Sequence, residues 1–240
     1  CHVSAPQVLL NGATFGDSTW ITKTGAGANT GNGGNIFQSY ASVSLAATAG
    51  GFLRTNYGNT YNGTLELSNA SGQELLLGLI SASTYSGDVL LRKTGAGNLR
   101  VAYAGANSFG GDIVLNNTQA LGSIAFCEGT GAAATLASGK KFLVGPSGVS
   151  AGTVLIQNIT QSSATDQDFT FTGNASLNLA KGNNFAGNVN VDLVGTGVAT
   201  IGATNTLNGK NTITAPQLFL SGTTFGDSTW ITKTGIANNT

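Results

Sequence analysis

Apolar and polar residues alternate along many short segments of this chain. The alternation is clear at residues 64–67, 98–101, 175–179 and 187–193, where every second residue is apolar. A period of two places successive side chains on opposite faces of a β-strand. Glycine or asparagine interrupts nearly every stretch long enough for a helix, and both disfavour helix interiors. The pattern therefore predicts an all-β protein of short strands joined by Gly- and Asn-rich turns.

An aromatic residue recurs at a nearly constant spacing, close to Asn, Ser, Thr or Gly. The recurring positions are Phe15, Phe37, Tyr61, Tyr85, Phe109, Phe185 and Phe225, and the first four steps measure 22, 24, 24 and 24 residues. The motif fades between Phe109 and Phe185. A second tag, Lys-Thr-Gly-Ala-Gly, occurs at 23–27 and again at 93–97, where it contains Gly95 and Gly97. Self-similarity at a fixed period is typical of repeat architectures.

A repeat of 22–25 residues built from short strands and Gly/Asn corners fits one coil of a parallel β-helix, or β-solenoid. Each coil buries its inward apolar residues only against its neighbours, so the core is a continuous column, and we expect about ten coils. A β-sandwich is the alternative, because it also has short strands and frequent turns. A sandwich does not require similar residues about every 24 positions. A solenoid stacks equivalent residues on one another, and this favours the solenoid.

The chain also repeats over a longer distance. Residues 3–30 and 213–240 share 19 identities in 28 positions at an offset of 210 with no gap, and the identities include Trp20 and Trp230. We interpret residues 1–212 as one solenoid unit and residues 213–240 as the start of the next copy, continuous with the same solenoid. We expect both tryptophans to pack in the core or between coils rather than to stack on a sugar.

Composition and charge exclude several classes of partner. Glycine accounts for 36 of the 240 residues, charged residues for 8%, and the formal net charge is zero. A neutral chain has no electrostatic attraction for nucleic acid or for an anionic membrane surface. The longest apolar run, residues 75–80, is too short to cross a bilayer. We therefore expect neither nucleic-acid binding nor membrane insertion. The absence of methionine predicts that the chain was cut from a longer protein.

One segment resembles a known repeat family. Residues 91–101 read Leu-Arg-Lys-Thr-Gly-Ala-Gly-Asn-Leu-Arg-Val, and residues 105–115 read Gly-Ala-Asn-Ser-Phe-Gly-Gly-Asp-Ile-Val-Leu. Together they resemble the autotransporter-associated β-strand repeat, also called the passenger-associated transport repeat. Tyr103 and Ala104 are two extra residues relative to that pattern, and Asp112 stands where the family usually has Thr.

The resemblance is good over residues 91–121, partial elsewhere and poor over 118–180. It implies a right-handed parallel β-helix in a bacterial surface or secreted protein, and therefore an extracellular or cell-surface location. Many proteins with such repeats are adhesins or structural stalks. The motif consists of core and corner residues, so the resemblance indicates architecture and export and little about activity.

The sequence contains few candidate catalytic residues. His2 is the only histidine, and a chain end does not hold a general base in place. Asp166 and Asp168 are spaced to point from one face of a strand, an arrangement similar to that of β-helical enzymes that cleave polysaccharides. We interpret them as solvated carboxylates, because residues 150–175 contain no basic residue. We expect no catalytic residues and no enzyme.

Asp88 and Asp112 are the weak candidates for a metal site. They occupy the same position in successive coils, each after a glycine, so their carboxylates are expected to stack. Like charges this close are unfavourable unless a cation, a lysine or a raised pKa relieves them. Calcium prefers oxygen ligands, but two carboxylates make a weak site. We therefore expect no metal and no cofactor, with calcium as the alternative.

Cys1 and Cys127 are separated by about five coils, or about 24 Å along the axis. A disulfide requires Cα atoms within about 7 Å. Unless the first residues fold back along the rod, the two cysteines do not pair within the chain. We expect free thiols or a disulfide with another chain, and burial of Cys127 is the remaining alternative.

Three functions fit these observations to different degrees. The favoured one is a structural extracellular segment that forms a stalk or a filament with other copies of itself, since open solenoid ends invite strand addition. The second is an adhesin module that binds a host surface or a glycan through the irregular region 118–180. The third, a polysaccharide-cleaving enzyme acting through Asp166 and Asp168, is the least favoured.

Overall fold

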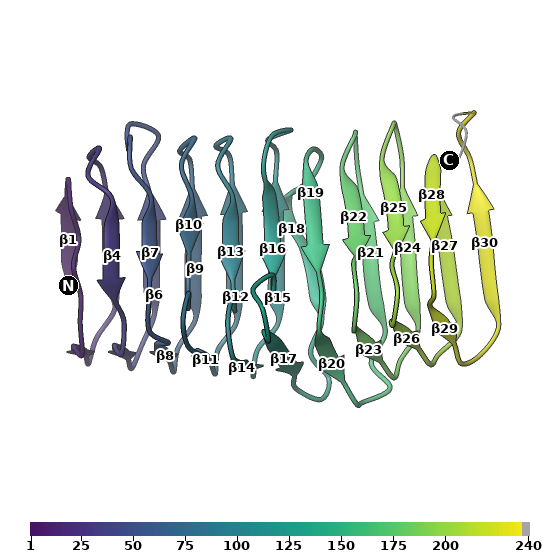
Figure 1. The fold of residues 1–240 in the computed structure, drawn as a ribbon, viewed down its shortest axis with the longest axis horizontal. Helices are drawn as coiled ribbons and strands as arrows, with labels where there is room; N and C mark the ends of the chain where they lie inside the picture. The colour runs from purple at the N-terminus through teal and green to yellow at the C-terminus, as the bar shows by residue number, and fades with distance from the viewer. Residues whose placement is uncertain (237–240) are drawn as a thin grey trace.

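The computed structural model describes residues 1–236, and at residues 30–32 it describes the backbone alone. Within these residues every regular element is a β-strand, and the strands wind into a rod with one strand of each coil on each of three faces (Figure 1). Neighbouring strands within a face are parallel and come from successive coils. The expected all-β, parallel β-solenoid is confirmed. The right-handed sense stays a prediction.

The three faces are defined by their strands. The first face comprises β1 (His2–Ala5), β3 (Thr19–Lys23), β6 (Ala41–Leu45), β9 (Leu65–Asn69), β12 (Val89–Lys93), β15 (Ile113–Asn117) and β18 (Phe142–Val149) in one sheet, and β21 (Gln167–Phe171), β24 (Val189–Leu193), β27 (Asn211–Ala215) and β30 (Thr229–Lys233) in another. The second face comprises β4 (Asn29–Asn32), β7 (Leu53–Thr55), β10 (Leu75–Leu76), β13 (Leu99–Val101), β16 (Ser123–Phe126), β19 (Thr153–Ile156), β22 (Ser176–Leu179), β25 (Val198–Ile201) and β28 (Gln217–Leu220). The third face comprises β2 (Thr14–Phe15), β5 (Ile36–Phe37), β8 (Thr60–Tyr61), β11 (Thr84–Tyr85), β14 (Ala106–Phe109), β17 (Ala133–Leu136), β20 (Ile159–Gln161), β23 (Asn184–Phe185), β26 (Thr206–Leu207) and β29 (Thr224–Phe225). The ten strands of the third face agree with the expected number of coils.

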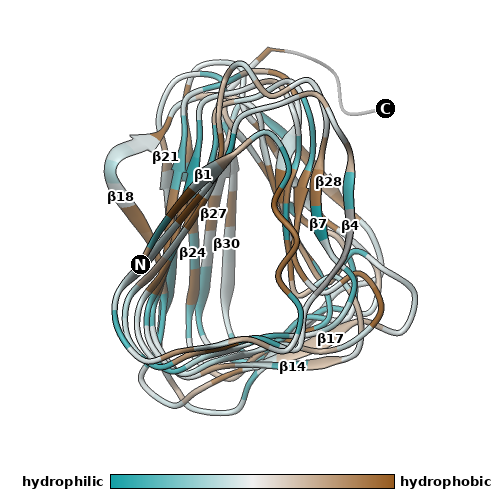
Figure 2. Ribbon diagram, turned by 90° about the vertical axis from the view of Figure 1, so that its left-hand side faces the viewer, coloured by the Kyte–Doolittle hydropathy of each residue, from teal (hydrophilic) through white to brown (hydrophobic). Residues whose placement is uncertain are grey.

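Equivalent residues of successive coils stack directly on one another. On the first face Leu65 pairs with Val89 and Val89 with Ile113, at a constant step of 24 residues. These side chains point inward and are buried, whereas the next residue along each strand faces outward. Figure 2 looks along the rod and shows the three faces arranged around this interior. The period-two alternation in the sequence is therefore the inward–outward alternation of the strands.

The recurring aromatic residues form a ladder on the inner side of the third face. Phe15 stacks on Phe37, Phe37 on Tyr61, Tyr61 on Tyr85 and Tyr85 on Phe109, with ring centroids 4.7–5.5 Å apart and interplanar angles of at most 8°. Phe185 and Phe225 occupy the equivalent positions of β23 and β29. The aromatic period of the sequence thus corresponds to one ladder position per coil, and Leu207 fills this position in β26.

The ladder is interrupted where the sequence motif fades. Leu136 and Gln161 take the ladder positions of β17 and β20. Aromatic rings from the other two faces fill the interior instead, in tilted and edge-to-face contacts that run from Phe109 through Phe126 and Phe142 to Phe169. On the outside, β18 departs from the regular register after Leu115 of its partner strand and bulges away from the rod (Figure 2).

The start of the second copy continues the same stack. Strand β27 pairs with β24 on one side and with β30 on the other. Residues 14–15 and 224–225 form equivalent strands, and so do residues 19–23 and 229–233. The two segments related by the 210-residue offset therefore form equivalent strands on the first and third faces, whereas on the second face residues 217–220 form β28 and residues 7–10 form no strand. Residues 237–240 lie outside the described part of the chain.

Candidate functional site

Buried polar side chains line the corner that precedes the third face. Asn35, Asn59, Asn107, Asn183 and Asn205 are all buried and each precedes a ladder position by two residues. Oδ1 of Asn59 accepts both the backbone N–H and the side-chain N–H of Asn35, at 3.0 Å each. Asn183 donates in the same way to Oδ1 of Asn205, at 2.9 and 3.0 Å. These amides supply the hydrogen bonds that the turning backbone does not make for itself.

Buried lysines hold the corner at the end of the first face. Nζ of Lys93 donates to the carbonyl oxygens of Gly95, at 2.9 Å, and of Leu121. Lys23 donates to the carbonyl oxygen of Gly25. Burial lowers the pKa of both lysines, that of Lys93 to about 8, because desolvation disfavours the ammonium form. The repeated Lys-Thr-Gly-Ala-Gly tag is therefore a structural corner.

The glycines of this tag are required by close packing between coils. A Cβ atom on Gly95 would collide with the carbonyl oxygen of Ser71, and one on Gly97 with that of Gln73. One coil earlier, Asn69 takes the place of the lysine, and its Nδ2 donates to the carbonyl oxygens of Gln73 and Asn98 at 2.9 Å. A Lys or Asn donor at this corner is a feature that the sequence analysis did not identify.

Asp88 and Asp112 lie on adjacent coils, as the repeat predicts. Oδ1 of Asp88 accepts the backbone N–H of Asp112 at 2.9 Å, and Oδ1 of Asp112 accepts that of Lys141 at 2.8 Å. Nζ of Lys140 lies 4.0 Å from the Asp112 carboxylate. Backbone N–H groups and a lysine thus relieve the repulsion between the two charges. Within residues 1–236 no three His, Cys, Asp or Glu side chains gather as a metal site would require.

Asp166 and Asp168 point from the same outer side of the first face, as their spacing predicts. Each is engaged by the next coil: Asp166 accepts the backbone N–H of Asn188 at 3.1 Å, and Asp168 accepts the side-chain N–H of Asn190 at 2.8 Å. The stacked coil also supplies a basic residue that the local sequence lacks, because Nζ of Lys141 lies 3.8 Å from Asp168. These contacts tie adjacent coils together.

An ion-pair ladder on the second face was not found from the sequence. Glu74 lies 2.5 Å from Arg54 of the preceding coil and 2.5 Å from Arg100 of the following one, and Arg100 lies 2.7 Å from Glu128. The four side chains alternate in sign along the axis. The solenoid register alone brings them together, since the gaps between neighbours in the ladder are unequal in the sequence.

The two cysteines have different environments. Both are free; Cys1 is exposed, whereas Cys127 is completely buried and burial raises the pKa of its thiol to about 12. The expectation of a disulfide between Cys127 and another chain is corrected, because its sulfur is inaccessible in the folded rod. Cys1 stays a candidate for such a bond.

The two tryptophans occupy equivalent outward positions with different neighbours. The ring of Trp20 stacks on His2, with centroids 4.3 Å apart, and makes a tilted contact with Tyr40 of the next coil. Trp230 stands on the last strand, β30, with Thr212 of β27 beside it in register. Trp20 therefore packs between coils, whereas Trp230, which is 57% exposed, does not show the packing expected of both tryptophans.

The last described coil presents an open edge. Ile21 of β3 is 3% exposed because β6 covers it, whereas its repeat Ile231 of β30 is 45% exposed. Trp230 and Leu220 are 57% and 43% exposed on the same edge. The edge thus displays, uncovered, the same strand sequence that is covered inside the first coils.

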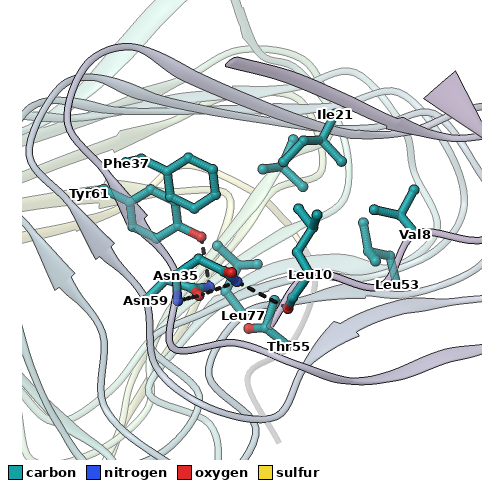
Figure 3. Close-up of a pocket in the computed structure, with 11 residues that line it drawn as sticks. Val8, Leu10, Ile21, Asn35, Phe37, Leu53, Thr55, Asn59, Tyr61 and Leu77 are labelled. Carbon is teal, nitrogen blue, oxygen red and sulfur yellow. Dashed lines mark hydrogen bonds between the residues drawn. The ribbon is translucent and has the colours of Figure 1, made fainter. Parts of the chain in front are cut away.

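The interior has a small cavity near the first coils. It measures ≈ 30 Å³ and is bounded by Val8, Ile21 and Leu53 on the apolar side and by the Asn35–Asn59–Tyr61 hydrogen bonds on the other (Figure 3). A volume of this size holds about one water molecule. It is a packing gap beside the first rings of the aromatic ladder rather than a substrate cleft.

The chain matched no protein-family model, no curated protein sequence and no solved structure. Along residues 1–236 there is no helix long and apolar enough to cross a membrane.

Proposed function

We propose that this chain is a structural segment of a large, repetitive, extracellular protein. It serves as part of a stalk or a filament that extends by end-to-end stacking of solenoid units, and its partners are other copies of itself. One observation carries the proposal: the sequence Thr-Trp-Ile-Thr-Lys-Thr-Gly occurs twice, and its two copies form strands β3 and β30 at equivalent places in one continuous stack.

Several features support this role. An uncovered strand edge with apolar side chains invites a further strand. Buried amides and a buried lysine donate hydrogen bonds from one coil to the next. The resemblance to autotransporter-associated repeats favours a bacterial surface or secreted protein, and this location is part of the proposal.

Electron microscopy of the purified chain at neutral pH tests the proposal. We expect filaments with a strand spacing near 4.8 Å and a longer repeat near about 43 Å, the rise of nine coils. Ile231→Lys places a charge on the open edge and is expected to abolish association. The matched control, Ile36→Lys, introduces the same charge on an outward position of the third face and is expected to leave association intact. Isolated rods in the unmodified protein would refute the filament.

An adhesin module is the second candidate. Its support is the bulge of β18, which breaks the regular rod within the irregular region 118–180 and exposes Leu143 and Val144. Deleting residues 145–148 is expected to abolish binding to a host surface or a glycan if the bulge is the contact. Unchanged binding by the deletion variant would remove this candidate.

A further inference from the structure

A row of threonines runs along the outer side of the third face. Each coil contributes the residue that precedes its ladder position, and seven of the ten residues are threonine. Strand pairing places every member beside the next along the whole face, which forms the lower edge of the rod in Figure 1. This threonine row is interrupted by Ile36, Ser108 and Asn184. Its threonines are Thr14, Thr60, Thr84, Thr135, Thr160, Thr206 and Thr224.

The hydroxyls of the threonine row have no partner inside the described part of the chain. Thr84, Thr135 and Thr160 are exposed, and within residues 1–236 none of the seven threonine hydroxyls bonds to another group of the protein. Outward hydroxyls on the first face differ, since those of Thr22 and Ser44 lie 2.9 Å apart and bond to each other. Branching at Cβ restricts the χ1 angle of threonine. The threonine row is therefore a nearly fixed array of hydroxyl and methyl groups that can bind a ligand outside the protein.

The strands of the third face carry no charge. None of the ten contains Asp, Glu, Lys or Arg, so a charged ligand finds no electrostatic partner on them. Their aromatic side chains are those of the ladder, which point inward and leave no ring on the outer surface for a sugar to stack on. We therefore expect an uncharged ligand that hydroxyl and methyl groups bind.

The threonine row is regularly spaced and straight. Neighbouring strands lie about 4.7–4.9 Å apart, which is close to the distance at which oxygen atoms repeat along the a axis of hexagonal ice. Over the first five coils the ladder rings behind the row are parallel to within 8°, so these coils do not tilt relative to one another. Sheets of many strands stay flat where stacking or side-chain ladders hold them. The inner ladder thus keeps the outer row in line.

We propose that the threonine row is an ice-binding surface, a function beyond the structural role proposed above. Its ligand is the water lattice at the surface of an ice crystal. The hydroxyls hydrogen-bond to lattice water, while the methyl groups and the exposed side chain of Ile36 lie against it. Each contact is weak, but contacts on one rigid rod act together when the ligand repeats at the same spacing. This favours a solid, periodic ligand over a single soluble molecule.

Thermal hysteresis, the gap between the melting and freezing temperatures of a single ice crystal in the protein solution, tests the proposal. We expect the unmodified chain to open a gap and to give the crystal facets. Thr84→Lys places a long charged side chain in the threonine row and is expected to remove most of the gap. Thr160→Lys repeats the test on another coil, with the same expected loss. Circular dichroism checks that each variant keeps its fold.

The matched control is Thr170→Lys. Thr170 is an exposed threonine on the outer side of β21, beside Asp192 of the next coil, and its replacement is expected to leave the gap unchanged. Equal gaps for the control and both row variants would overturn the proposal. Absence of a gap in the unmodified chain would also overturn it, and retention on microcrystalline cellulose would then assign the row to a polysaccharide. The proposed stalk or filament has its own test, association, and stands or falls separately.

Discussion

Asn35 gives both its backbone and its side-chain N–H to a single oxygen, Oδ1 of Asn59, one coil away. Asn59 in turn donates its side-chain N–H to the hydroxyl of Tyr61, at 3.1 Å. One amide thus links the corner of its own coil, the preceding coil and the aromatic ladder. All three side chains are buried.

Replacing this amide is expected to destabilise the rod. Asn59→Ala leaves two buried donors of Asn35 without an acceptor, and we expect a loss of about 2–4 kcal/mol in the free energy of unfolding. The control Asn62→Ala removes an exposed amide and is expected to cost about 0.5 kcal/mol or less. Urea denaturation measures both. If Asn59→Ala and Asn62→Ala lost the same unfolding free energy, the buried hydrogen bonds of Asn59 would contribute no more to stability than an exposed amide does.

The aromatic ladder is expected to contribute through packing. Tyr61 is 1% exposed between two stacked rings, so Tyr61→Ala should cost about 3–5 kcal/mol through lost burial and a cavity. Tyr57→Ala removes the same side chain from an exposed turn and should change stability little. Thermal unfolding followed by circular dichroism compares the two. Similar midpoints for both variants would contradict a packed ladder.

Lys93 is expected to make stability depend on pH. Its pKa is lowered to about 8 in the folded chain, so between about pH 8 and its ordinary value the unfolded chain binds more protons, and stability rises with pH. Lys93→Met lacks this group. The unfolding free energy of the parent relative to the variant should therefore increase by an amount on the order of 1–3 kcal/mol from pH 7 to pH 10.5.

Other groups do not disturb this comparison. Burial raises the pKa of Cys127 and Tyr61, which lowers stability at high pH, but both chains carry these groups equally. If the unfolding free energies of the parent and of Lys93→Met changed in parallel with pH, Lys93 would not be the source of the pH dependence.

The two thiols should react at very different rates. The thiolate is the nucleophile, and burial keeps Cys127 protonated and inaccessible. Iodoacetamide at pH 8 should add one group to the native chain, on Cys1, and two in denaturant, as counted by intact mass. Modification of Cys127 in the native chain would mean that the central coils open readily.

The sequence predicted the architecture because the solenoid repeats its own pattern. Phe15, Phe37, Tyr61 and Tyr85 recur at a nearly constant spacing in the sequence. Because each coil has nearly the same length, this spacing places their rings on top of one another. The contacts between unlike coils were harder to predict. Arg54, Glu74, Arg100 and Glu128 form no period, and the role of Lys93 depends on the carbonyl of Leu121, which the neighbouring coil brings into reach.

One feature of the first face could not be predicted from the sequence. The bulge of β18 follows no repeat, so its position outside the rod came only from the structure. The burial of Cys127 was one of several alternatives until the strands were placed.

The stacking of one strand per coil has a mechanical consequence. The hydrogen bonds between coils run along the axis of the rod, so a force that pulls on the two chain ends loads them in series. Each coil then peels from its neighbour separately and releases the 18–32 residues between paired positions of adjacent coils, or about 60–110 Å of extended chain. Under load the rod would lengthen one coil at a time and absorb work at each step, as a shock-absorbing tether does.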